Sequence, residues 1–106
     1  MVEIKKTTKT NFLNVMGANP TNRIIDFLIE NKRDSWSMIE IRDGANVSYA
    51  TLKTILPKMQ KIGLLKITRQ IGKSKLYTID EDNPIVKKIM LLHKEIIQES
   101  EMFINV

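Results

Sequence analysis

The hydrophobic pattern of this 106-residue chain changes its period at Gly63. Before that glycine, apolar residues recur at spacings of three and four, which is typical of amphipathic helices. From residue 65 to 79 apolar and polar residues alternate around a short basic tip, Gly72-Lys73-Ser74, and this predicts a β-hairpin. Helical spacing returns after residue 84. The pattern therefore predicts a mostly α fold with one small β-hairpin.

Capping signals set the limits of the first two helices expected before the hairpin. Asn19-Pro20 reads as an N-cap followed by proline at the first helical position, and it starts a helix from about 20 to 31. Ser37-x-x-Glu40 is a capping box, in which each side chain bonds the other residue's backbone N–H, and it opens a helix from 38 to 43 that stops at Gly44. The buried side of the first helix is expected to consist of Ile24, Ile25, Phe27, Leu28 and Ile29.

A four-residue turn, GANV, joins the second helix to the third, which is the length used in helix-turn-helix units. Val47 is expected to be buried, and Ser48 to cap the third helix, which ends at Gly63. Trp36 is expected to be a short strand residue that packs on the core. The order of helix, helix, helix, hairpin and helix predicts a winged helix-turn-helix.

The two ends of the chain flank this unit. Residues 1–18 are predicted to form a basic arm (Lys5, Lys6, Lys9) and a short apolar segment, FLNVM, whose pattern fits either a strand or a helical turn. Residues 19–80 are predicted to form the winged helix-turn-helix domain, and residues 81–106 a C-terminal dimerisation helix. That last helix begins at a second Asn-Pro pair, Asn83-Pro84.

Composition excludes several classes of function. The chain has no cysteine and one histidine, so we expect no disulfide, thiolate nucleophile, metal site or cofactor. It lacks a phosphate-binding glycine loop, and its carboxylates are spaced like helix surface charges, which argues against an enzyme. No apolar run is long enough to span a membrane and no signal peptide is evident, so the expected location is the cytoplasm.

Charge is distributed unevenly along the chain. All twelve acidic residues lie outside residues 44 to 79, so this window is purely cationic within a chain of net charge +5. Its basic residues are Lys53, Lys58, Lys61, Lys66, Arg69, Lys73 and Lys75. A solvated basic surface would have the same composition, but clustering within one supersecondary unit favours binding to a polyanion.

Two segments, VSYATLKTILPKMQKIGLLKITR and QIGKSKLYTIDEDNPIVKKI, resemble archaeal winged-helix transcriptional regulators, related broadly to the multiple-antibiotic-resistance-regulator and arsenic-sensor-type repressors. The resemblance covers roughly residues 19 to 97 and rests on the order and spacing of weak motifs. It implies a homodimer on double-stranded DNA, with the third helix in the major groove and the wing on the backbone or minor groove. The arsenic-sensor members use cysteines that this chain lacks, which argues against their metal response.

The third helix is expected to divide into a core face (Leu52, Ile55, Leu56, Met59) and an outer face that carries Pro57. Proline removes one backbone hydrogen bond and bends a helix locally, so the turns before Pro57, which contact bases in such folds, stay intact. The residues expected to contact DNA, from this helix and from the wing, are Ser48, Tyr49, Ala50, Thr51, Lys53, Thr54, Lys58, Arg69, Lys73 and Lys75. Ser48 has a sufficient role as a cap, and Tyr49 either packs on the second helix or contacts DNA.

The final helix carries two apolar seams where one domain needs only one. One seam runs through Ile85, Ile89, Leu92, Ile96 and Phe103, and the other through Val86, His93, Ile97 and Ile104. Two seams predict that one packs on the domain and the other on a partner's equivalent helix. The residues expected at the dimer interface are Ile85, Ile89, Leu92, His93, Ile96, Ile97 and Phe103.

These patterns predict a homodimeric winged-helix transcription regulator that binds DNA. The alternative is a winged-helix module that binds protein or RNA in a plasmid-maintenance or transcription assembly. Such modules usually lose the basic third helix and wing, which this chain keeps. A small-molecule effector in a pocket between the last helix and the core is compatible with the sequence, but no residue pattern identifies one.

Overall fold

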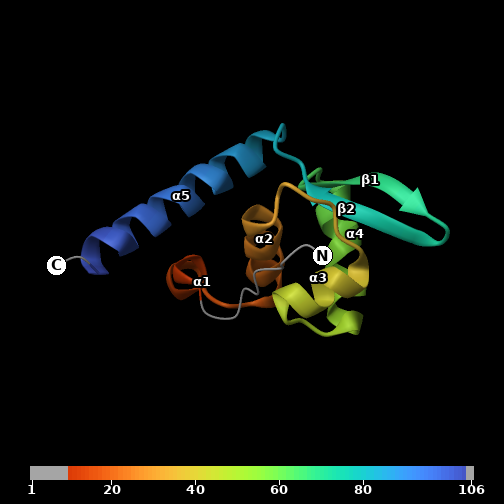
Figure 1. The fold of residues 1–106 in the computed structure, drawn as a ribbon, viewed down its shortest axis with the longest axis horizontal. Helices are drawn as coiled ribbons and strands as arrows, with labels where there is room; N and C mark the ends of the chain where they lie inside the picture. Colours follow the sequence, from red (N-terminus) through yellow and green to blue (C-terminus); the bar gives the residue numbers. More distant parts are fainter. Residues whose placement is uncertain (1–9, 105–106) are drawn as a thin grey trace.

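The structure is a computed structural model that describes residues 10–104, with side chains described as far as residue 99. Five helices and one hairpin follow each other along the chain (Figure 1). They are α1 (Asn11–Met16), α2 (Pro20–Glu30), α3 (Met38–Ala45), α4 (Tyr49–Lys61), β1 (Leu65–Ile71), β2 (Ser74–Ile79) and α5 (Pro84–Ile104). The prediction of a mostly helical chain with one small hairpin is confirmed.

The apolar segment near the N-terminus is a helix, α1. The Thr10 hydroxyl caps it by accepting a hydrogen bond from the Leu13 N–H at 3.2 Å. Phe12 and Leu13 are buried in the same core as the central helices. The basic arm predicted from Lys5, Lys6 and Lys9 lies outside the described residues.

The caps predicted for the central helices are confirmed. The Asn19 side chain accepts from the Asn22 N–H at the start of α2, and Ser37 and Glu40 form the complete capping box of α3. The Ser48 hydroxyl accepts from the Thr51 N–H at the start of α4. These bonds satisfy backbone donors that a helix otherwise leaves free in its first turn.

The predicted stop of α3 at Gly44 is wrong. The helix continues to Ala45, and Asn46 takes the left-handed conformation (φ 56°) that ends it. Gly44 has a packing role instead, because a Cβ atom at this position would overlap the Phe27 ring. The glycine lets α2 and α3 approach closely, while asparagine, which tolerates the left-handed region, supplies the turn.

The end of α4 leads directly into the hairpin. Gly63 (φ 80°) closes the helix as predicted, and the Leu64 N–H donates back to the Met59 carbonyl at 2.9 Å. β1 and β2 are antiparallel, and the two residues Gly72 and Lys73 connect them. Ser74, predicted within the tip, instead begins β2 and pairs with Ile71.

Trp36 is bound to the hairpin as a single strand residue, as predicted. It exchanges two 2.8 Å backbone hydrogen bonds with Tyr77, and its side chain is buried against Phe27. The pairing strengthens an isolated hairpin that would otherwise be marginally stable. It fixes the wing to the segment that precedes α3.

Asn83 joins the end of α4 to the start of α5. Its side-chain oxygen Oδ1 accepts hydrogen bonds from the Ile85 and Val86 N–H groups at 2.8 and 3.3 Å, which caps α5. Its amide nitrogen donates to the Ile62 carbonyl, just after α4, at 3.3 Å. The side chain therefore satisfies backbone groups of both helices.

The core lies between α2, α3, α4 and the hairpin, and its largest fully buried side chains include Phe27, Ile24, Leu28, Ile41 and Leu52. Val86 and Ile96 of α5 extend this core toward α1. The hairpin and the C-terminal half of α5 project in opposite directions from it (Figure 1). Within residues 10–104, none of the helices combines the length and the apolar character that crossing a membrane requires.

Candidate nucleic-acid interface

The outer face of α4 is exposed along its whole length, as predicted. Its exposed residues are Ala50, Lys53, Thr54, Pro57, Lys58 and Lys61. The opposite face buries Leu52, Leu56 and Met59, and Ile55 is half-buried against the same core. Burial of one face fixes the rotation of α4, so that its cations point away from the protein.

Two hydroxyls at the start of α4 are bonded to each other. The Ser48 hydroxyl donates to Thr51 Oγ1 at 2.8 Å while it accepts from the Thr51 N–H at 3.1 Å. The Thr54 hydroxyl donates to the Ala50 carbonyl at 3.2 Å. The first turns of α4 therefore present small, internally satisfied polar groups, which permit the close approach of another backbone.

Tyr49 and Lys53 form the most prominent part of this surface. Tyr49 is 44% exposed, and the Lys53 ammonium lies 5.7 Å from the centroid of its ring, within the range of a cation–π contact. Burial, and then the nearby Tyr49, raise the pKa of Tyr77 in β2. The start of α4 and the hairpin thus lie close together.

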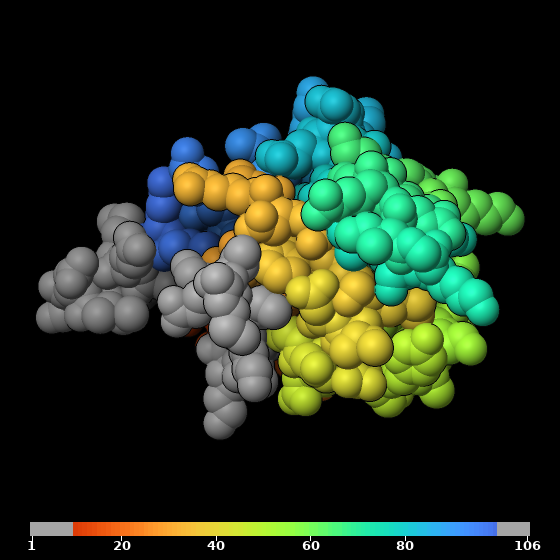
Figure 2. Space-filling view, turned by 45° about the vertical axis from the view of Figure 1, so that its right-hand side comes forward, coloured from red at the N-terminus to blue at the C-terminus, as the bar shows by residue number. Residues whose placement is uncertain are grey.

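A depression of about 340 Å³ lies between the start of α3, Tyr49 of α4 and the hairpin. Ser37, Met38 and Ile39 line it together with Tyr49, and Lys73 and Lys75 line it from the hairpin. The residues predicted to contact DNA from two different elements therefore border one concave surface. Figure 2 shows the hairpin beside α3, with parts of α4 at the same side of the molecule.

The cations of the wing are all exposed. Arg69 lies on β1, Lys73 in the turn and Lys75 on β2. A β-bulge between Ile67 and Arg69 interrupts the alternation expected from the sequence, because Thr68 has no partner in the register. Thr68 bonds the Ser35 hydroxyl at 2.6 Å instead. Bulges bend a strand and redirect its side chains, so Arg69 falls outside the simple alternation.

Pro57 lies within a helix that continues from Tyr49 to Lys61. Its ring is on the exposed face, and it follows two intact turns. The first turns of α4, which carry Tyr49 and Lys53, are therefore undisturbed by the proline.

The residues predicted at the dimer interface differ in their burial. His93 and Ile96 are buried within the chain itself, and Ile89 and Ile97 are half-buried. Ile85 and Leu92 are 52% and 42% exposed. The side chain of Phe103 lies outside the described residues.

Burial of His93 has a cause that the sequence reasoning missed. Its Nε2 lies 2.7 Å from Oδ1 of Asp26, a carboxylate with no exposed surface, and 3.5 Å from Oε1 of Glu30. The signal was present in the sequence, because Asp26 interrupts the apolar run from Ile24 to Ile29 at a buried position. An acid there needs a buried partner, and the single histidine supplies it.

The chain matches no protein-family model and no curated protein. Its fold is similar to several solved structures. A mutant of Lactococcus lactis ZitR in apo form is 19% identical, with 88% of this chain and 73% of that chain covered and a TM-score of 0.64. Wild-type ZitR in complex with DNA is 17% identical, covering 78% and 59%, with a TM-score of 0.58.

Sso10a-2, a DNA-binding protein from Sulfolobus solfataricus, is 18% identical, covering 78% of this chain and 86% of its own, with a TM-score of 0.53. At identities this low, the structural similarity shows the fold alone, and any function must be argued from the residues of this chain. The shared fold, together with the helix order and the wing, makes this chain a winged helix-turn-helix protein.

Proposed function

We propose that this chain is a homodimeric transcription regulator that binds double-stranded DNA, with α4 in the major groove and the wing on the backbone or minor groove. The observation that carries the proposal is the set of exposed cations on α4 and the hairpin. Its cations come from separate elements, all are exposed, and the segment from residue 44 to 79 that contains them has no carboxylate.

The shape of this surface supports duplex DNA as the partner. An α-helix fits the width of the major groove, and a hairpin beside it reaches the adjacent backbone. Tyr49 of α4 and Lys73 and Lys75 of the hairpin line one depression, and the two lysines suit contact with phosphates. ZitR and Sso10a-2, which share the fold, are described as a protein solved on DNA and a DNA-binding protein.

Sequence readout is expected to be modest. The first two turns of α4 carry no Asn, Gln or Arg for a bidentate bond to a base, and the hydroxyls of Ser48, Thr51 and Thr54 already have partners within the helix. Phosphate contacts and DNA shape therefore contribute most of the binding energy.

The exposed edge of α5 supports a dimer. Ile85, Ile89 and Leu92 follow one another at spacings of four and three, the pattern of a helix pair, and Ile85 and Leu92 are only half covered by their own chain. Pairing these edges about a two-fold axis would place two α4 helices on one duplex. His93 and Ile96, which the chain itself buries, are left out of the proposed interface.

Binding to random and promoter-region duplexes across a salt series tests the DNA proposal. Each phosphate contact contributes about 0.9 to the slope of log affinity against log salt, so Lys53→Ala with Lys73→Ala is expected to reduce the slope by about 2. Lys87→Ala with Lys88→Ala, which removes two exposed lysines from α5, is the matched control and should leave the slope unchanged. Failure of the wild type to bind any duplex at low salt would overturn the proposal and favour a protein partner.

A further inference from the structure

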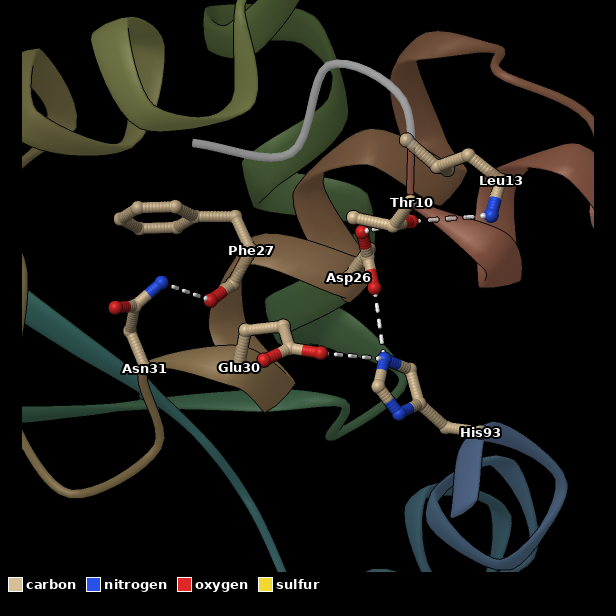
Figure 3. Close-up of polar contacts among 7 residues, drawn as sticks. All are labelled: Thr10, Leu13, Asp26, Phe27, Glu30, Asn31 and His93. Carbon is tan, nitrogen blue, oxygen red and sulfur yellow. Dashed lines mark hydrogen bonds and ion pairs between the residues drawn. The ribbon is translucent and has the colours of Figure 1, made fainter. Parts of the chain in front are cut away.

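Three potential metal ligands meet where α5 crosses α2. Asp26 and Glu30 are one turn apart on α2, so their carboxylates share a face, and His93 reaches them from α5 (Figure 3). One ligand atom of each residue lies within 4.8 Å of the other two. The imidazole Nε2 faces both carboxylates at once, 2.7 Å from Asp26 and 3.5 Å from Glu30.

Surrounding groups fix the orientation of these ligands. The Thr10 hydroxyl donates to Oδ2 of Asp26 at 2.7 Å, which leaves Oδ1 directed at His93. The Phe12 ring packs on the imidazole with 4.9 Å between centroids. Metal ligands are held in this way by a second layer of hydrogen bonds and packing, and the layer here comes from α1 and the residue before it.

The charge of the cluster suits a cation. Carboxylates only accept hydrogen bonds, so the single proton on Nε2 faces two acceptors, one of them completely buried. A divalent ion in place of that proton would neutralise the charge of both carboxylates, including the fully buried one of Asp26. An imidazole nitrogen with two carboxylate oxygens is a ligand set for a transition metal such as Zn²⁺ rather than for Mg²⁺ or Ca²⁺.

The distances are close to those of such a site. Ligand atoms around a tetrahedral zinc ion, with bonds near 2.0–2.1 Å, are about 3.3 Å apart. The Nε2 to Glu30 distance of 3.5 Å already meets this requirement. The Nε2 to Asp26 distance of 2.7 Å must lengthen by about 0.6 Å for an ion to lie between the two atoms.

The cluster is reachable from solvent on one side. Glu30 and His93 line an open groove of about 920 Å³ between α2 and α5, whereas Asp26 closes the inner side. An ion can enter through this groove, and water there can complete its coordination.

We propose that Asp26, Glu30 and His93 bind one Zn²⁺-like divalent ion that clamps α5 to α2. Occupancy would stabilise one position of α5 relative to α4 and the wing. If α5 pairs two copies on DNA, an inference that rests on the proposed function, the ion would also influence the distance between the two reading helices.

The single histidine makes a direct test possible, provided that the full chain carries no histidine tag. Chemical shifts of the ¹⁵N-labelled imidazole are followed while Zn²⁺ is added to the free protein. The expected result is a shift of Nε2 that saturates at one equivalent, together with a higher midpoint of thermal unfolding. Because DNA is absent, this outcome does not depend on the proposed function.

Two variants separate a ligand set from a structural hydrogen bond. Glu30→Gln removes a ligand but leaves the bond between Asp26 and His93, and it is expected to weaken zinc affinity at least about tenfold, the lower limit seen for loss of a supporting residue. Glu81→Gln is the control, since Glu81 lines the same groove outside the cluster. An imidazole signal that does not respond to several equivalents of Zn²⁺, or equal affinity in the two variants, would overturn the proposal.

Discussion

Charged groups are placed differently in two regions of the molecule. One region is the surface formed by α4 and the hairpin, and the other is the junction of α2 with α5. On the first, the cations from residue 44 to 79 are exposed and have no carboxylate within their own segment. At the second, the carboxylate of Asp26 and the imidazole of His93 are buried and in direct contact. Uncompensated exposed charge attracts a partner at little cost to folding, whereas buried charge contributes to stability only while its partner is present.

The largest expected effect comes from breaking the junction. Asp26→Ala leaves His93 and the Thr10 hydroxyl without their shared acceptor inside the protein, and it is expected to lower the free energy of unfolding by about 3 kcal/mol. Urea unfolding measures the change. Asp34→Ala, which removes an exposed acid, should stay within about 0.5 kcal/mol of the wild type. A loss below 1 kcal/mol for Asp26→Ala would show that the pair contributes little.

A smaller change in free energy is expected on the exposed edge of α5, which belongs to neither of the two regions. Leu92→Glu puts a charge on the proposed pairing surface and is expected to weaken dimerisation by about 2 kcal/mol for each leucine removed from the interface. Sedimentation measures the association. Leu91→Glu changes an even more exposed leucine on another side of the helix and is the matched control. Equal dimerisation of the two variants would place the interface elsewhere.

The smallest change in free energy is expected at Ser48, where stability and DNA binding can be tested on the same side chain. Ser48→Ala removes the cap of α4 and is expected to cost about 1 kcal/mol of unfolding free energy. Ser48→Asp keeps a capping oxygen but adds a negative charge at the start of α4, so it should restore stability while it weakens DNA affinity. Unchanged DNA affinity in Ser48→Asp would place this end of α4 away from phosphates.

Local chemistry explains which parts of the fold were predictable. Each cap depends on residues within three positions of one another, so Asn19, Ser37, Ser48 and Asn83 could all be identified from the sequence. The period of the apolar pattern likewise located the hairpin and the core face of α4. Gly44 was misinterpreted because its role depends on the Phe27 ring, which comes from another helix.

The junction was only partly predictable, because the sequence signals that Asp26 needs a buried partner but not how that partner reaches it. His93 and Asp26 are separated by 67 positions, and only the packing of α5 on α2 brings them together. The apolar neighbours of His93 suggested an interface between copies, but the histidine is buried by its own chain. The exposure of Lys53 and Lys73 was easier to predict, since it depends on the charge of the sequence and on elements that are defined locally.

The side chain of Asn83 couples the start of α5 to the end of α4. Asparagine has both an acceptor and a donor on one rigid amide, and here the acceptor caps α5 while the donor bonds the carbonyl of Ile62 behind α4. An aspartate would keep the first bond and lose the second, because a carboxylate cannot donate. The start of α5 is thus linked to the residue that follows α4 through a single planar group. A rotation of α5 about its first turn would therefore displace the end of α4.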